Sequence, residues 1–343
     1  MKVPDPEYDH ELHITAGLIR ATIPANLIEG FSQVSGISER DFQNCSPTSS
    51  GEISAIDGSH FIMLESGSTA LAILRAAQTT YWDMKRFRRS LTPLKFALIG
   101  PETENQIFPE LYRSCFGQVP GTPLANDDKS RAAAILRDTL EYWVTEQMAT
   151  ELNTGALLLR DGPLRVSHAS HDPVLIRIVD TCKERDIDLV GVSKRTTSTW
   201  GGGHPLLLSV GGLAKSLQIR PPWWIRINPS ILDRSQFPQW QHGQMFIVCL
   251  HPRAKSPLKV ELPRDLPLVQ IEEIMNRLVS CSGDGRIPGY PFPLFDAHRT
   301  VTLTKEVVDQ VRNDLVTGLV ESGLDRQTYD ILFGDYHNEF ARY

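Results

Sequence analysis

The fold expected of this chain is decided by two stretches, SAIDGS at residues 54–59 and LLLRDGPL at residues 157–164. Each is an apolar, β-prone run that ends in an aspartate followed directly by a glycine. A buried strand that finishes in a carboxylate places that charge at the rim of its sheet, and the glycine leaves room for a closely approaching ligand or backbone. If the two rims converge, Asp57 and Asp161 can bind a hard divalent cation through oxygen. Either Asp-Gly pair alone is also a common turn signal.

The composition is that of an ordinary globular protein. The 343 residues are 41% hydrophobic and 22% charged. The net charge of -6 argues against a uniformly basic nucleic-acid coat, although local basic patches could still bind DNA. The five cysteines are widely spaced without a CxxC motif, which disfavours disulfides and a zinc site. With no signal peptide and no apolar run of about eighteen residues, we expect a cytoplasmic protein without a membrane segment.

Alternating strand and helix patterns predict an α/β fold with a mixed sheet flanked by helices. Strands are expected at residues 52–57, 69–77, 96–100, 156–160, 188–192, 223–227, 245–250 and 258–261, and helices at residues 127–152, 172–185, 268–281 and 305–322. Residues 1–50 form an irregular or helical N-terminal extension, and residues 51–322 form the main domain. Residues 323–343 are a tail that packs on this domain or on a partner.

A third carboxylate would complete a good divalent site, and the helix over residues 127–152 offers Glu141, Glu146 and Glu151. Glu141 shares a polar stripe with Arg137 and Thr145, four residues away on either side. A helical glutamate usually faces water, so periodicity alone gives Glu141 no special role.

The segment GYPFPLFDAH at residues 289–298 lies near the C-terminus. Its two prolines predict an extended path that brings His298 close to the start of a helix. A neutral histidine there can bind a metal or position a water, or it can be a capping or core residue. Asp296 is most simply a helix N-cap.

Five short segments, in order along the chain, resemble motifs of the NurA nuclease family. The sequence Asp57-Gly58-Ser59 is similar to the first motif, and a helix carrying Glu141 that leads into LLLRDGPL resembles the second and third. The stretch VGVSK at residues 190–194 resembles the next strand with its terminal lysine. The stretch YPFPL at residues 290–294, followed by Ala297-His298, is similar to the C-terminal motif.

This resemblance implies an RNase H-like fold with N-terminal and C-terminal elaborations, and a manganese-dependent DNA nuclease in which Mg²⁺ could replace Mn²⁺. It implies action from 5′ to 3′ on DNA ends, cutting of single strands, and a homodimer docked on the hexameric HerA translocase in DNA end processing, repair or defence. It matches Asp57, Glu141 and Asp161 to the family's acidic metal ligands. It matches Tyr290 and His298 to its C-terminal site residues. Helix register alone separates Glu141 from Glu146.

Basic residues could complete such a site. Phosphodiester hydrolysis needs an activated water and stabilised charge on the phosphoryl oxygens, which two metal ions about 4 Å apart supply. Lys194 follows a predicted strand and is either a phosphate contact or a solvated loop lysine. A basic segment interleaved with aromatic residues could track a DNA backbone, or could be an ordinary surface helix, and it contains Lys85, Arg86, Arg88 and Arg89.

A second interpretation keeps the fold without the catalysis. An RNase H-like module could clamp DNA onto a translocase or regulate its ATPase. Clustered carboxylates argue against this alternative, because they repel DNA unless a metal neutralises them. No GxxxxGK[ST] loop is present, so any use of ATP requires a partner.

Overall fold

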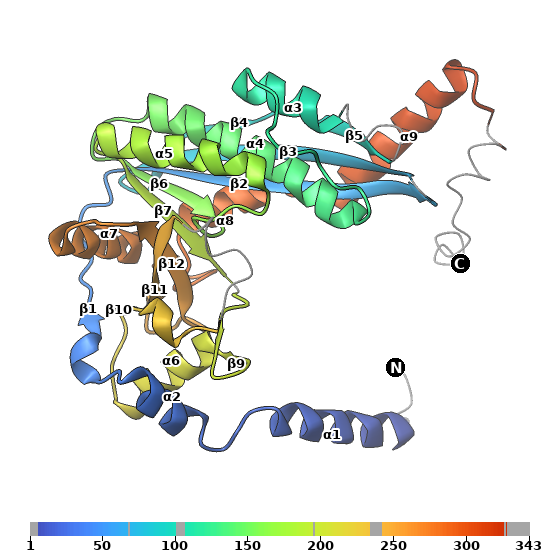
Figure 1. Cartoon of the computed structure of the whole chain (residues 1–343). Coiled ribbons are helices and arrows are strands. Elements are labelled where there is room, and N and C mark those ends of the chain that lie inside the picture. The colour runs from blue at the N-terminus through green and yellow to red at the C-terminus, as the bar shows by residue number, and fades with distance from the viewer. Residues whose placement is uncertain are drawn as a thin grey trace.

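The structure is a computed structural model that describes residues 6–67, 69–100, 107–194, 196–233, 242–325 and 327. A large mixed sheet runs through these residues, with helices on both faces (Figure 1). In spatial order its strands are β1 (Gln43–Asn44), β10 (Trp223–Arg226), β11 (Gly243–Cys249), β12 (Leu258–Pro263), β7 (Asp188–Ser193), β6 (Leu157–Asp161), β2 (Glu52–Ser66), β3 (Thr69–Trp82) and β4 (Lys85–Leu91), and β5 (Lys95–Ile99) also pairs with β3. The predicted mixed α/β architecture is confirmed.

Helices cover the two faces of the sheet unequally. One face carries α3 (Ile107–Phe116), α4 (Lys129–Glu151) and α5 (Asp172–Glu184), and the other carries α7 (Leu268–Ser280) and α8 (Phe292–Val301). The outer strands β10 and β11 are covered by α2 (Leu27–Ser35) and α6 (Leu206–Ser216), while α9 (Lys305–Glu321) packs on the far ends of β2 and β3. The short elements are η1 (Glu39–Asp41), η3 (Ala169–His171), η4 (Pro229–Ile231) and the hairpin of β8 (Thr199–Trp200) and β9 (His204–Pro205).

The parallel centre of the sheet positions the two Asp-Gly motifs. Strands β2, β6 and β7 run parallel, with Ile56 opposite Arg160 across the β2–β6 pair. Ile56 belongs to the core beneath α4, whereas Ala55 and Leu159 belong to the core beneath α7 and α8. Because strand side chains alternate between faces, the aspartate that follows each run points to the α8 side.

Several predicted elements differ from the structure. The strands β2 and β3 are far longer than expected, and their far ends, where β5 also pairs with β3, reach α9 (Figure 1). The basic segment is strand β4 and not a helix. The helices α3 and α6 are not among the predicted elements, and α8 begins at Phe292, well before the helix start expected near His298. For α8 the prolines were misleading, because Pro293 occupies the first turn, where a missing N–H carries no penalty.

The N-terminal region combines two kinds of structure. The helix α1 (Pro6–Ala21) extends away from the sheet, with its described side chains exposed (Figure 1). The strand β1 pairs with β10 and so joins the edge of the sheet. Of the predicted C-terminal tail, all but residues 323–325 and 327 lie outside the described residues. Among the helices of the described ranges, none is long and apolar enough to cross a bilayer.

A close approach beside the second Asp-Gly motif gives the first prediction. A Cβ at Gly191 on β7 would lie 2.7 Å from the carbonyl oxygen of Gly162. We expect Gly191→Ala to lower the free energy of unfolding by about 1–3 kcal/mol, because backbone must move to accept the methyl group. Gly121→Ala, where nothing lies within 4 Å of the new methyl group, is the matched control. Equal denaturation midpoints for the two variants would contradict the prediction.

Candidate metal centre

Three predicted site residues meet at the end of β6. One potential ligand atom from each of Asp57, Asp161 and His298 lies within 4.8 Å of the others. The aspartates come from the adjacent parallel strands β2 and β6, and the histidine comes from α8, which packs across β2 and β3. Two carboxylates and an imidazole suit Mn²⁺ or Mg²⁺ chemically, and the spacing matches ligands around one ion.

The Asp57 carboxylate is fixed on both oxygens. The Gly58 amide donates a hydrogen bond of 2.8 Å to Asp57 Oδ1, and His298 Nδ1 lies 2.7 Å from Asp57 Oδ2. The Asp57 side chain is nearly buried, whereas 52% of the His298 side chain is exposed. The centre is therefore anchored on the sheet side and open to solvent on the α8 side.

Electrostatics at the centre favours a bound cation. Burial and the neighbouring Asp57 carboxylate raise the pKa of Asp161, while Lys194 and His298 act to lower it. Lys194 Nζ lies 2.8 Å from Asp161 Oδ2, so the lysine already supplies part of the missing positive charge. A divalent cation would relieve the remaining repulsion between the two aspartates.

Tyr290 and Lys194, the other predicted residues of this centre, lie beside the aspartates. The Tyr290 hydroxyl is buried and finds no hydrogen-bond partner among the described residues. Burial, together with the Asp161 and Asp57 carboxylates, raises its pKa well above the ordinary value. Lys194 Nζ lies 5.1 Å from the centroid of the Tyr290 ring. A buried phenol that lacks a hydrogen-bond partner and lies next to two carboxylates can donate a hydrogen bond to an incoming acceptor or coordinate a cation through its oxygen.

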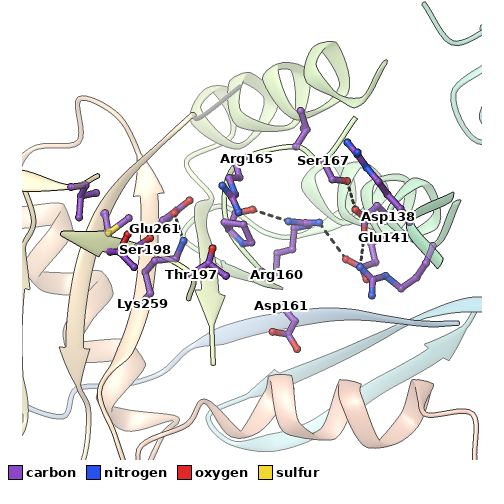
Figure 2. A pocket seen from close by; sticks show the side chains of 18 of the residues that line it. Asp138, Glu141, Arg160, Asp161, Arg165, Ser167, Thr197, Ser198, Lys259 and Glu261 are labelled. Carbon is purple, nitrogen blue, oxygen red and sulfur yellow. Dashed lines mark hydrogen bonds and ion pairs between the residues drawn. The ribbon is translucent and has the colours of Figure 1, made fainter. Parts of the chain in front are cut away.

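Glu141 lies on the opposite face of the sheet. It is buried on α4, with Arg137 Nε 3.0 Å from Oε1 and Arg160 Nη2 3.3 Å from Oε2. Figure 2 shows Arg160 directed toward Glu141, while Asp161 points away from both. Burial raises the pKa of Glu141, and the two arginines oppose that effect. Glu141 thus lies outside the Asp57–Asp161–His298 group, and its burial is contrary to the expectation that a helical glutamate faces water.

The alternative glutamate on the same helix lies elsewhere. Glu146 forms an ion pair of 2.9 Å with Arg177 of α5. Glu141 instead packs directly over Gly58, where any Cβ would overlap the Glu141 and Arg137 side chains. The glycine predicted to leave room for a ligand or backbone therefore leaves room for a side chain of α4. Gly162 is required for a different reason, since its φ of +120° favours glycine.

The predicted basic segment is an edge strand with exposed side chains, and all three of its arginines have acidic partners. Arg89 Nη2 and Arg86 Nη1 lie 2.7 Å and 3.3 Å from the Asp296 carboxylate, which also accepts a 2.7 Å hydrogen bond from Tyr81. Arg88 pairs with Glu151 at 2.8 Å, and the Lys85 side chain has no ion-pair partner in the described ranges.

The prediction of Asp296 as an N-cap is wrong, because it lies in the middle of α8 and is buried.

Comparison with known proteins identifies the fold and the family of this chain. The described fold is RNase H-like and resembles the NurA nuclease from Sulfolobus solfataricus, with a TM-score of 0.59, 14% identity, and coverage of 93% of this chain and 98% of that one. Residues 51–303 match the NurA domain family, and the chain therefore belongs to that family.

Two further solved structures are similar. One is another NurA, with a TM-score of 0.55, 9% identity, and coverage of 90% of this chain and 97% of that chain. The other is NurA bound to dAMP and manganese, with a TM-score of 0.43, 11% identity, and coverage of 93% and 98%. No curated protein sequence matches this chain.

Loss of the Asp296 cluster should weaken the helix that carries His298. We expect Asp296→Ala to lower the free energy of unfolding by about 1–3 kcal/mol, because Tyr81 and two arginines lose their shared acceptor. The control is Asp309→Ala, which removes a half-exposed partner of Arg312 on α9 and should change stability by less than about 0.5 kcal/mol. Chemical denaturation measures both, and an Asp296→Ala loss no larger than the control's would contradict the role assigned to the cluster.

The raised pKa of Asp161 gives a pH prediction. A carboxylate ligand must be deprotonated, so Mn²⁺ affinity should fall as the pH drops through the raised pKa of Asp161. Lys194→Met removes a group that lowers this pKa, and the loss of affinity should therefore begin at a higher pH. Isothermal titration with Mn²⁺ across a pH series measures the midpoint, with exposed Lys255→Met as the control. A midpoint that stays in place or moves to lower pH in Lys194→Met would contradict the assignment.

Proposed function

We propose that this chain is a metal-dependent DNA nuclease whose centre is formed by Asp57, Asp161 and His298. The observation that carries the proposal is the convergence of these three side chains within 4.8 Å, in a chain that belongs to the NurA family. The cofactor is Mn²⁺, with Mg²⁺ as a substitute. Residues 51–322 form the nuclease domain.

The reaction is hydrolysis of a phosphodiester. Water forms a new bond to phosphorus, the bond from phosphorus to the leaving sugar oxygen breaks, and that oxygen gains a proton. When bound, the metal would supply Lewis acidity toward the phosphoryl oxygens and would make the water more acidic. The two aspartates and His298 would hold the ion, and the exposed side of His298 keeps the centre open to substrate.

Lys194 and Tyr290 act on the phosphate in this proposal. The Lys194 ammonium, 2.8 Å from Asp161 Oδ2, is placed to balance negative charge on a phosphoryl oxygen beside the centre. The Tyr290 hydroxyl stays protonated, since its pKa is raised, and donates a hydrogen bond to the phosphate or to the attacking water. Glu141 is the third acidic group, and it reaches a metal only if it leaves Arg137 and Arg160.

The proposal extends to finer features, which family membership supports. They are 5′ to 3′ action on DNA ends, cutting of single strands, homodimer formation, and work with a HerA-type hexameric translocase in DNA end processing, repair or defence in the cytoplasm. The five cysteines are free thiols, which is compatible with a reducing compartment. Of the basic strand, Lys85 and the half-exposed Arg86, Arg88 and Arg89 are the groups proposed to contact DNA.

Removal of one carboxylate tests the proposal. We expect Asp57→Asn to reduce cleavage of a single-stranded oligonucleotide in Mn²⁺ by at least about a hundredfold, because it removes the negative charge and one of the two oxygens of a metal ligand. The matched control is Glu272→Gln, which neutralises an exposed carboxylate on α7 and should cleave like the wild type. EDTA should abolish cleavage by every active variant.

The same variants separate the two interpretations of the fold. Mn²⁺ should raise the melting temperature of the wild type and of Glu272→Gln, but not of Asp57→Asn. Wild-type DNA binding that is independent of metal and is never followed by cleavage would favour the interaction module. Cleavage by Asp57→Asn at the same rate as the wild type would show that the active centre lies elsewhere.

A further inference from the structure

The two aspartates of the metal centre are held by the sheet in different ways. Asp57 lies inside the long strand β2, which continues to Ser66, whereas Asp161 is the last residue of β6. Burial and the Asp57 carboxylate both raise the pKa of Asp161, so the two carboxylates repel each other. A strand end gives way to such a force more readily than the middle of a paired strand. The position of Asp161 therefore depends on the loop that follows it, residues 162–164.

Both backbone N–H groups of this loop have acceptors. The Gly162 amide donates to the Val192 carbonyl at 2.8 Å, and Pro163 has no N–H. The Leu164 amide donates at 2.7 Å to Oε2 of Glu261, a residue of β12 that is 97 positions away in the chain. One amide of the loop is thus bound by the neighbouring strand β7 and the other by a carboxylate from a strand further out in the sheet.

This carboxylate belongs to a buried ion pair. Lys259, two residues earlier on β12, lies with Nζ 2.7 Å from Glu261 Oε1 (Figure 2). The exposed fractions of the two residues are only 5% for Lys259 and 1% for Glu261. Apolar side chains of similar volume often replace such a pair without loss of stability. Stability alone therefore explains the pair poorly, and the feature that apolar side chains would lack is the acceptor for the loop.

Two glycines allow the neighbouring strands to pack closely around this hydrogen bond. A Cβ at Gly191 on β7 would lie 2.7 Å from the Gly162 carbonyl oxygen and 3.1 Å from the Leu164 nitrogen. A Cβ at Gly243 on β11 would lie 2.9 Å from Glu261 Cβ and 3.1 Å from Leu164 Cβ. The loop and its acceptor are therefore confined from both sides, so that a change at the acceptor is passed on to the loop.

We propose that Glu261 is a positioning residue for Asp161, and that Lys259 balances the charge of Glu261 in the interior. By fixing Leu164, Glu261 fixes the end of β6 and keeps the Asp161 carboxylate within the metal centre. The inference rests on the proposed function, in which Asp161 is a metal ligand. Glu261 acts through the loop backbone and does not itself bind the metal.

Two double variants that differ only in residue 261 test this role. The first, Lys259→Met/Glu261→Gln, keeps an amide oxygen for the Leu164 N–H, and the second, Lys259→Met/Glu261→Met, does not. Both remove the two charges together, which avoids leaving one charge buried without a partner. In isothermal titration with Mn²⁺ without DNA, the first variant should bind like the wild type. The dissociation constant of the second should be at least about tenfold higher.

A control separates positioning from a loss of stability. Asp188→Asn breaks the buried ion pair of 3.1 Å with Arg277 at the opposite end of β7. This variant should lower the melting temperature measured without Mn²⁺ and leave the Mn²⁺ affinity unchanged. A merely structural role for Glu261 would give the second double variant that same pattern, whereas a positioning role lowers its Mn²⁺ affinity.

A single variant keeps the test decisive if the second double variant does not fold. Glu261→Asp retains both charges of the pair and withdraws the carboxylate from Leu164 by one methylene group, so its Mn²⁺ affinity should also fall. Equal Mn²⁺ affinities of the two double variants would overturn the inference. Wild-type affinity of Glu261→Asp, where this variant carries the test, would overturn it as well.

Failure of the inference is separable from failure of the proposed function. A wild type that binds Mn²⁺ and cleaves DNA, while every variant at position 261 binds Mn²⁺ equally well, leaves the metal centre intact and removes the role of Glu261. A wild type that binds no Mn²⁺ removes the proposed centre itself.

Discussion

The parallel pairing of β2 with β6 is the constraint on which the site depends. With Ile56 opposite Arg160, the residues that follow, Asp57 and Asp161, lie next to each other on the same face of the sheet. A slip of one residue in either strand would turn one carboxylate to the other face and separate the pair. The register is held by apolar neighbours such as Ala55 and Leu159, which fill the core beneath α7 and α8. Burial of those side chains therefore keeps two like charges together, and a cation can offset the electrostatic penalty.

The sheet also separates two charged clusters. On the α8 face, the two carboxylates of Asp57 and Asp161 have one lysine, Lys194, as an ion-pair partner. On the α4 face, Glu141 is held by two arginines and the surrounding acids have their own donors. The first cluster suits a cation, whereas the charges of the second are matched to one another. Because β6 ends at Asp161, the two clusters meet at the end of that strand, where a phosphodiester could contact both.

The histidine of the centre depends on a scaffold far from it in sequence. Thr79 donates to the Pro293 carbonyl at 3.0 Å, and Arg75 donates to the Val301 and Thr302 carbonyls at 3.0 Å and 2.9 Å, so β3 holds both ends of α8. The Asp296 cluster anchors the middle of the helix to β3 and β4. Part of the basic strand is thus used to position α8.

The sequence by itself determined the class of fold and most of the strands, and it singled out Asp57 and Asp161, because apolar runs that lead into Asp-Gly and the period of α4 are local signals. It wrongly ended the first strand at Asp57, since β2 continues to Ser66 and only Asp161 closes its strand. It could not decide that Glu141 is buried, since a helix register does not reveal an arginine arriving from β6. It also missed Asp296, whose partners Tyr81 and Arg89 lie more than two hundred residues away in the chain. Only the tertiary structure decided which charges meet, because long-range ion pairs depend on how strands and helices pack and leave no periodic trace in the chain.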